Sequence, residues 1–253
     1  MRMRRLTILG VVCALALSAL AMPAPVSAQE ASHYTFVSFW AVPRAQWSDY
    51  EKADADTNAI LGKLVADGTL EAYGSCAILV HAEDGYSHIN WFTSASQAGI
   101  VKTLDALKGV SRSPQLVAAT KHRDFLQHTI GHGGKTVNTT SGYVRVSIWQ
   151  AKPGRGEDVE NFFKKYIQPD LDAGVADGSV LSYNFDTEQV HTDAPGGYFL
   201  AVTYANGEGL DKAMAMLAKH AKDDPAAGEA FGSMMETKDH RDLLGRILAF
   251  QHK

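Results

Sequence analysis

The sequence predicts an α+β protein in which one βαββαβ unit occurs twice and forms two antiparallel sheets. Three observations support this fold class: matched segments recur about 110 residues apart, strand-like and helical segments alternate within each half, and a Gly/Thr-rich stretch separates the halves. The predicted organisation is a signal peptide at 1–28, a first repeat at 29–131, a linker at 132–142 and a second repeat at 143–253.

The first 28 residues have the layout of a secretory signal. Arg occupies three of the first five positions, Leu6–Leu20 is apolar, and Val26–Ala28 supplies small residues at a cleavage point. The apolar stretch is short for a membrane span, which needs about 20 residues, although a retained anchor stays the alternative. We therefore expect a periplasmic or secreted protein with no membrane attachment after cleavage.

Composition narrows the classes of partner. The formal net charge is -4 at pH 7, and loss of the three signal Arg residues makes it about -7. Because no run of Lys and Arg remains, we expect neither nucleic acid nor an anionic membrane surface as a partner. Cys76 is the one Cys after the signal, so the exported chain has no internal disulfide and depends on its apolar core.

Self-comparison supports the duplication. The matched residues never change order, and their offset drifts only from about 109 to about 118 through short insertions. Such conserved order within one chain is typical of two copies of one structural unit. The matches are Val37–Trp40 with Val146–Trp149, Ala66–Gly68 with Ala176–Gly178, Tyr73 with Tyr183, His81 with His191, Tyr86 with Tyr198, and His122–Asp124 with His240–Asp242.

A strand and then a helix are predicted to open each repeat. Aromatic and β-branched residues concentrate in Tyr34–Val42 and Tyr143–Gln150, which favours strands. Helical periodicity follows both, and Pro169 should kink or break the second of these helices. Asp-Gly at 67–68 and 177–178 suits a helix end, since Gly tolerates a positive φ.

A hairpin, a helix and a last strand complete each repeat. Leu70–His81 and Tyr86–Thr93 flank an Asp-Gly turn, and the second hairpin turns at Ala194–Gly197. The last helical region of each repeat is predicted to end in a His-Arg-Asp segment. Short final strands are expected at Gln127–Gly131 and Arg246–Gln251.

The βαββαβ order is the ferredoxin-like motif, and two copies on one chain resemble the dimeric α/β-barrel superfamily. The resemblance covers nearly all of the chain after the signal and lies in topology, since no diagnostic motif accompanies it. It implies two antiparallel sheets packed face to face as a pseudo-dimeric α/β barrel. The superfamily includes cofactor-free antibiotic-biosynthesis-type monooxygenases, NIPSNAP-like proteins and haem-dependent chlorite dismutases, so the fold alone selects no activity.

Strand alternation separates a uniformly apolar face from a mixed one. Val144, Val146 and Ile148 are expected to pack under the helices, as are Val37 and Phe39. The opposite face would line the barrel, where aromatic and a few polar groups suit a small-molecule pocket, or would simply fill it as core. The ligand contacts expected on this face are Trp40, Tyr73, Asn90, Arg145, Trp149 and Tyr183.

Histidines are the candidate bases if the protein is an enzyme. A cofactor-free oxygenation or related proton transfer then fits best, with His81, His88 or His191 accepting the proton. The Tyr and Arg side chains of the same face would orient the ligand or stabilise negative charge. The repeats also differ, because Asn90 in the first corresponds to aliphatic Leu200 in the second. In a duplicated fold, a pocket that is used for chemistry can become different from its counterpart in the other repeat.

Two alternatives to a ligand-binding barrel stay open. One is a non-catalytic module with a solid barrel core, whose exposed faces mediate association, including a homo-oligomer. The other is a haem protein, which the resemblance implies, with His81, His88, His128 or His191 as the iron ligand. No separate metal site is predicted, because the sequence has neither HExxH nor paired Cys.

Two further features are interpreted as structural. His-Arg-Asp at 122–124 and 240–242 has none of the companion motifs of a kinase, so we expect both copies at equivalent places at the end of a helix. A catalytic interpretation returns if one Asp lines a pocket and its twin does not. All four Met residues after the signal lie within 214–235, where a core or subunit interface is favoured over a binding groove.

Overall fold

Each half of the chain folds as a βαββαβ unit in the computed structural model, which describes residues 32–80, 85–110, 114–190 and 196–253. The first repeat contains, in order, β1 (His33–Trp40), η1 (Arg44–Gln46), α1 (Trp47–Ala66), β2 (Ala72–Ile78), β3 (His88–Ser94), α2 (Gln97–Leu107), α3 (Pro114–Val117) and β4 (His122–Gly134). After β5 (Val137–Thr139), the second contains β6 (Tyr143–Ala151), α4 (Gly156–Phe162), the π-helix η3 (Phe163–Ile167), α5 (Gln168–Asp177), β7 (Val180–Glu188), β8 (Gly197–Tyr204), α6 (Gly207–Asp223), α7 (Pro225–Met234) and β9 (Met235–His252).

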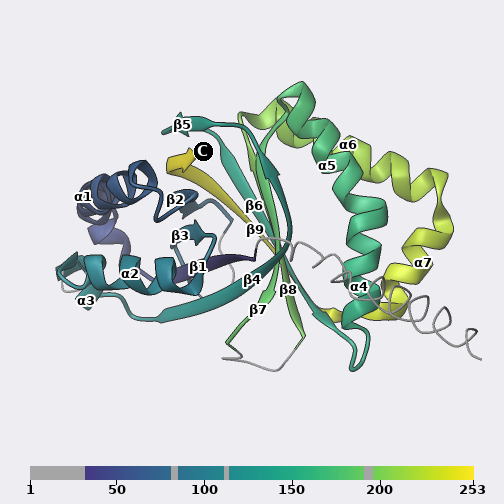
Figure 1. Ribbon diagram of the computed structural model, residues 1–253, viewed down its shortest axis with the longest axis horizontal. Helices are drawn as coiled ribbons and strands as arrows, with labels where there is room; N and C mark the ends of the chain where they lie inside the picture. Colours follow the sequence, from purple (N-terminus) through teal and green to yellow (C-terminus); the bar gives the residue numbers. More distant parts are fainter. Residues whose placement is uncertain (1–31, 81–84, 111–113, 191–195) are drawn as a thin grey trace, which may run out of the picture. The chain divides into compact units, whose positions relative to one another are not determined.

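The strands form one closed antiparallel sheet that joins the two repeats. Their order is β2-β3-β1-β4-β7-β8-β6-β9, and pairing of β9 with β2 completes the ring, with β5 added at the end of β9. Helices α1–α3 lie on one side of the strands and α4–α7 on the other (Figure 1). The predicted fold class, two ferredoxin-like units with sheets face to face, is confirmed.

The duplication extends to details of the helix ends. Gly68 and Gly178 both adopt positive φ, at 84° and 85°, as the two Asp-Gly pairs predict. Asp67 and Asp177, which precede them, each bind a Lys of the following helix, Lys102 at 3.3 Å and Lys212 at 2.7 Å. Pro169 lies in the first turn of α5, just after η3, so the predicted interruption of this helix is also present.

The two faces of the sheet are used in the opposite way from the prediction. Val37, Phe39, Val144 and Val146 line the interior of the barrel, where they meet the apolar side chains of the other sheet. The mixed aromatic and polar face lies under the helices. The prediction was wrong because uniform apolarity indicates the most completely enclosed layer, and here that layer lies between the sheets.

Both His-Arg-Asp segments lie on strands, so their expected helical setting is also wrong. His122 begins β4, and His240 lies within β9. The burial of β4 alternates along its length, and the strand pairs with β1 over the whole of Tyr34–Trp40, which overrides the local helical pattern. The predicted linker at 132–142 contains the end of β4 and all of β5.

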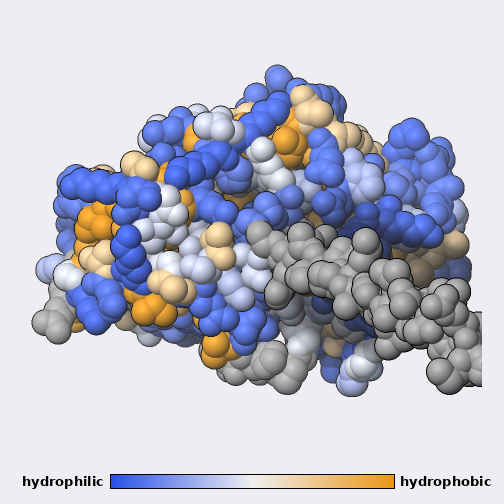
Figure 2. Space-filling model, viewed as in Figure 1, coloured by the Kyte–Doolittle hydropathy of each residue, from blue (hydrophilic) through white to orange (hydrophobic). Residues whose placement is uncertain are grey.

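The surface drawn in Figure 2 is mainly hydrophilic, with small apolar areas among the polar ones. Exposed large apolar side chains in the described ranges include Val101, Leu104 and Val117 of the helices that cover the first repeat. None of the helices in the described part of the chain is both long and apolar enough to span a bilayer.

A buried carboxyl group lies where the two repeats join. Asp186 of β7 pairs in register with Thr129 of β4, and its side chain accepts a hydrogen bond from the Thr129 hydroxyl at 2.6 Å. Asp186 is 1% exposed, and burial raises its pKa to about 7 against the opposing effect of this hydrogen bond. In the unfolded chain the pKa returns to about 3.9.

Stability should therefore fall as the pH rises from about 4 to about 7, because over this window the folded state holds a proton that the unfolded state has released. Replacing Asp186 by Asn removes this dependence, which amounts to as much as roughly 4 kcal/mol. Urea unfolding at pH 4 and pH 8 measures it. The exposed-site variant Asp56→Asn should keep the wild-type dependence, and an unchanged slope in Asp186→Asn would contradict the assignment.

Candidate functional site

Each repeat has a cavity between the sheet and its helices. The first-repeat cavity has a volume of about 250 Å³ and the second-repeat cavity about 310 Å³. The barrel interior, where sequence analysis expected the ligand, leaves only about 50 Å³. Such a space accommodates one or two water molecules, so the candidate site lies on the helix-facing side.

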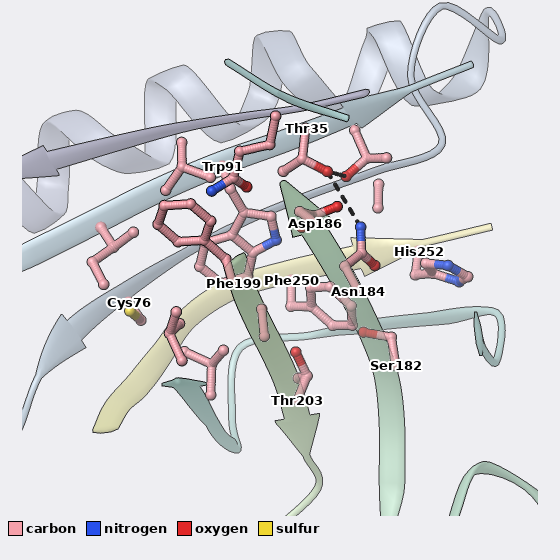
Figure 3. Close-up of a pocket in the computed structure, with 18 of the residues that line it drawn as sticks. Thr35, Cys76, Trp91, Ser182, Asn184, Asp186, Phe199, Thr203, Phe250 and His252 are labelled. Carbon is pink, nitrogen blue, oxygen red and sulfur yellow. Dashed lines mark hydrogen bonds between the residues drawn. The ribbon is translucent and has the colours of Figure 1, made fainter. Parts of the chain in front are cut away.

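Figure 3 shows why the barrel interior is unsuitable for a larger ligand. Trp91, Phe199 and Phe250 fill its centre, and Thr35 accepts a hydrogen bond from Asn184 beside Asp186 at one end. These side chains come from strands of both repeats. The interior is therefore the shared core of the barrel, with a small polar end.

A row of polar side chains crosses the first-repeat sheet beneath its cavity. Strand register places Ser75 beside Asn90, Asn90 beside Ser38, and Ser38 beside Asp124. All four residues are on the face toward the helices, because Ser38, Asn90 and Asp124 line the cavity and Ser75 binds helix α1 through Asp54. This polar row forms the floor of the site.

Asp54 of α1 lies against this row as a buried carboxylate. Its oxygens accept hydrogen bonds from Asn90 at 2.6 Å, Asn58 at 2.9 Å and the Ser75 hydroxyl at 2.5 Å. Burial raises the pKa of Asp54, and these hydrogen bonds oppose the rise. The Tyr50 hydroxyl donates to the Asn90 side-chain oxygen, so both ends of this amide are fixed in orientation.

The other end of the row carries a carboxylate–histidine pair. Asp124 Oδ1 accepts one hydrogen bond from the Ser38 hydroxyl at 2.6 Å and lies 2.8 Å from His122 Nε2. The His122 ring stacks on Trp40, with ring centres 3.6 Å apart and planes inclined by 16°. Both side chains are about 40% exposed, at 39% for His122 and 41% for Asp124, so solvent and ligands reach them.

Aromatic and aliphatic side chains form the rest of the cavity. Those of the sheet are Phe36, Trp40 and Phe92, and those of the helices and their connections include Leu61, Leu104, Leu107, Val110 and Leu116. A mainly apolar enclosure with a few fixed polar groups is the usual composition of a small-molecule pocket. The first repeat thus combines such a pocket with two carboxylates and an imidazole.

The second repeat has apolar residues at two of the four matching positions of the row. Its register runs from Phe185 to Leu200, Ser147 and Asp242, in place of Ser75, Asn90, Ser38 and Asp124. Phe163 stacks on Phe185, with ring centres 4.1 Å apart. This pair takes the place of Asp54 and Ser75, which form a hydrogen bond in the first repeat. The asymmetry expected at Asn90 and Leu200 is therefore part of a wider exchange of polar for apolar groups.

The carboxylate of the second repeat is held differently. Asp242 accepts from the Ser147 hydroxyl, but it also forms a 2.7 Å ion pair with Arg145, and His240 Nε2 is 3.4 Å away. The residue that matches Arg145 in the first repeat is Phe36. Asp124 is among the residues that line a cavity and Asp242 is not, which is the outcome that restores a catalytic interpretation of the first His-Arg-Asp segment.

The expected ligand-binding residues are divided between the two cavities and the core. Trp40 and Asn90 line the first cavity, and Arg145 and Trp149 line the second. Tyr73 and Tyr183 are 7% and 1% exposed and belong to the apolar cores under the helices, where the Tyr183 hydroxyl donates to Asp172.

Of the three expected bases, His88 lies in the part of the chain that the structure describes. His88 is fully buried behind the first cavity, with its Nδ1 3.0 Å from the Ser87 hydroxyl and its ring 4.3 Å from that of Tyr50. His81 and His191 lie outside the described residues.

Three further site residues were not predicted from the sequence, namely Ser38, Tyr50 and Asp54, and the His122–Asp124 pair was interpreted as structural. A signal for Asp54 was present, because it lies four residues after Tyr50 and seven before Leu61 on the apolar side of a helix. An acidic residue within such a stripe requires partners when buried. Two of its three partners, Ser75 and Asn90, come from strands β2 and β3, and only the three-dimensional structure identifies these two.

The second-repeat cavity fits a haem poorly. His220 does line it, with Nδ1 2.9 Å from Asp170 Oδ2, a pairing that is common for metal-ligating His. However, about 310 Å³ is near the lower limit for ordinary organic ligands, and a haem is larger. Among the described lining residues, Arg145 is the one Lys or Arg that could meet a haem carboxylate, and it is bound to Asp242.

Metal coordination by clustered side chains finds no support in the described ranges. No group of three or more His, Cys, Asp or Glu there is placed to hold a metal ion.

Comparison with known proteins identifies the fold. No protein-family model matches the chain, and no curated protein matches it in sequence. A candidate monooxygenase from Fusobacterium nucleatum superposes with a TM-score of 0.70 at 12% identity, over 89% of this chain and 96% of that one. A candidate monooxygenase from Lactobacillus acidophilus gives 0.67 at 13% identity, over 87% and 96%.

A third solved structure, of an anthrone oxidase-like protein, gives a TM-score of 0.51 at 9% identity over 90% of this chain and 95% of that one. At these identities the comparisons establish architecture and leave activity to the site itself. With its two sheets and their helices in the same arrangement, the chain has the dimeric α/β-barrel fold, with both ferredoxin-like units on one polypeptide.

Proposed function

We propose that the first-repeat cavity binds a small, flat aromatic molecule with a hydroxyl or similarly acidic group and removes a proton from it. The observation that carries this proposal is the His122–Asp124 pair at the wall of an aromatic cavity, two strands from the fixed Asn90 amide. Its twin pair lies beside an Arg ion pair instead. A carboxylate–imidazole pair of this kind is a common general base.

In this mechanism His122 accepts the proton at Nδ1. Because Nε2 faces the Asp124 carboxylate at 2.8 Å, the neutral ring carries its hydrogen there and leaves Nδ1 as the acceptor. Asp124 then stabilises the imidazolium, and Trp40 keeps the ring in place by stacking. The Asp54–Asn90–Tyr50 network holds the polar floor rigid against the ligand.

The proposed reaction class is oxygenation by dioxygen without a cofactor. Loss of a proton makes an aromatic substrate electron-rich, and this activation is what a direct reaction with dioxygen requires. The names of the structural neighbours, two candidate monooxygenases and an anthrone oxidase-like protein, support the choice by analogy of fold. For anthrone, one dioxygen would be consumed and anthraquinone and one water formed.

Oxygen uptake with anthrone as substrate tests the base. We expect His122→Gln and Asp124→Asn to lower kcat by roughly 100-fold, the usual contribution of a general base. The twin variants His240→Gln and Asp242→Asn should stay within about twofold of the wild type in kcat, once thermal unfolding has shown that each variant is folded. Equal losses in both repeats would contradict the assignment to the first cavity.

The polar floor is tested by copying the second repeat into the first. Asn90→Leu should weaken binding of 4-nitrophenol by about tenfold, the value of one hydrogen bond to a polar ligand group. Nitrobenzene, which has the same ring without the hydroxyl, is the matched ligand and should bind equally well to both proteins. Calorimetric titration measures both affinities. An equal loss for the two ligands would indicate a collapsed cavity and refute the polar contact.

A further inference from the structure

The second-repeat cavity is kept open by small residues among large ones. Phe162, Phe185 and Phe231 form much of its wall, whereas Ala213, Ala227 and Gly228 occupy positions on the covering helices. A Cβ atom added to Gly228 would meet no heavy atom within 4 Å. Gly228 is exposed at the edge of the cavity, whereas Ala213 and Ala227 are buried, and larger side chains at these two buried positions would fill space that protein cores normally lack.

The helix that forms one wall of the cavity is also irregular. Phe163, Tyr166 and Ile167 line the cavity from η3, a π-helical segment, whereas the corresponding helix α1 of the first repeat is continuous from Trp47 to Ala66. Single π-helical turns are rare and are frequent at functional sites. Pro169, just after η3, favours this interruption, and the irregular turn places three side chains on the cavity wall.

Four polar residues of the cavity wall already have hydrogen-bond or ion-pair partners. Arg145 and Ser147 bind Asp242, and His220 binds Asp170. The remaining lining of the described residues is dominated by aromatic, aliphatic and thioether side chains, with Met214, Met216 and Met235 among them. A charged ligand would have to compete with an existing ion pair, whereas a neutral one would meet polarizable, adaptable surfaces.

We propose that the second-repeat cavity is a separate binding site for a neutral, apolar molecule of the aromatic hydrocarbon type. Its volume of about 310 Å³ suits a ligand of two or three fused or linked rings. The His122–Asp124 pair belongs to the other repeat, across the closed sheet, so this site binds without reacting. The protein thus carries one reactive cavity and one that holds an apolar compound.

N-phenyl-1-naphthylamine, a neutral probe whose fluorescence increases on leaving water, tests this site directly. Gly228→Phe should weaken its binding at least tenfold, because the new ring occupies the open edge of the cavity. The matched control is Gly232→Phe on the same helix, which also meets no atom within 4 Å and does not line the cavity. Both changes replace a helical Gly by a better helix former, so both variants should fold.

Leu200→Phe, which adds volume from the sheet side, is the second variant and should give the same loss as Gly228→Phe. His122→Gln should leave probe binding unchanged, and 4-nitrophenol should not displace the probe, so failure of the reactive-site proposal is distinguished from failure of this one. No binding to the wild type, or equal affinities of the Gly228, Leu200 and Gly232 variants, would overturn the second site.

Discussion

Apolar packing between the two sheets determines which side chains of each strand face the helices. Val37, Phe39, Val144 and Val146 meet across the barrel with the aromatic side chains of neighbouring strands and leave room for little more than water. Burial of this area is the main favourable term in the fold, at roughly 25 cal/mol per Å². Because alternate side chains point to opposite faces, this packing commits the mixed residues of the same strands to the helix-facing layers.

The two helix-facing layers can differ because the barrel core separates them. In the first repeat, a buried acid, an amide and a hydroxyl form a connected network, and each polar atom of the buried Asp54 carboxylate is paired. In the second, aromatic and aliphatic groups replace them, and the cavity is larger and drier in character. A buried polar network is stabilising only when it is complete, so the exchange involves several residues together.

The sequence was sufficient to predict the repeat structure and most strands, because these follow local rules. Periodicity indicates the strand at Val37–Trp40, turn geometry explains the Asp-Gly pairs, and the side-chain ring of Pro169 explains the interrupted helix. It was insufficient for the assignment of faces, since alternation shows that two faces differ but not which one meets the other sheet. Asn90 and Arg145 were recognised by type, yet their partners Asp54 and Asp242 are 36 and 97 residues away. The segment around His122 was predicted to be helical because its strand depends on pairing with β1, which a local sequence pattern does not show.

Closure of the ring has a consequence for how the chain reaches its native state. The first repeat presents β2 as an open edge until β9, the last strand, pairs with it along Ala72–Ile78. Contacts of such long sequence separation form slowly, and an unpaired strand edge is a template for association with another chain. An incompletely synthesised or truncated molecule therefore carries two exposed edges at once. These edges are β2 and β6, and both are covered only once β9 is in place.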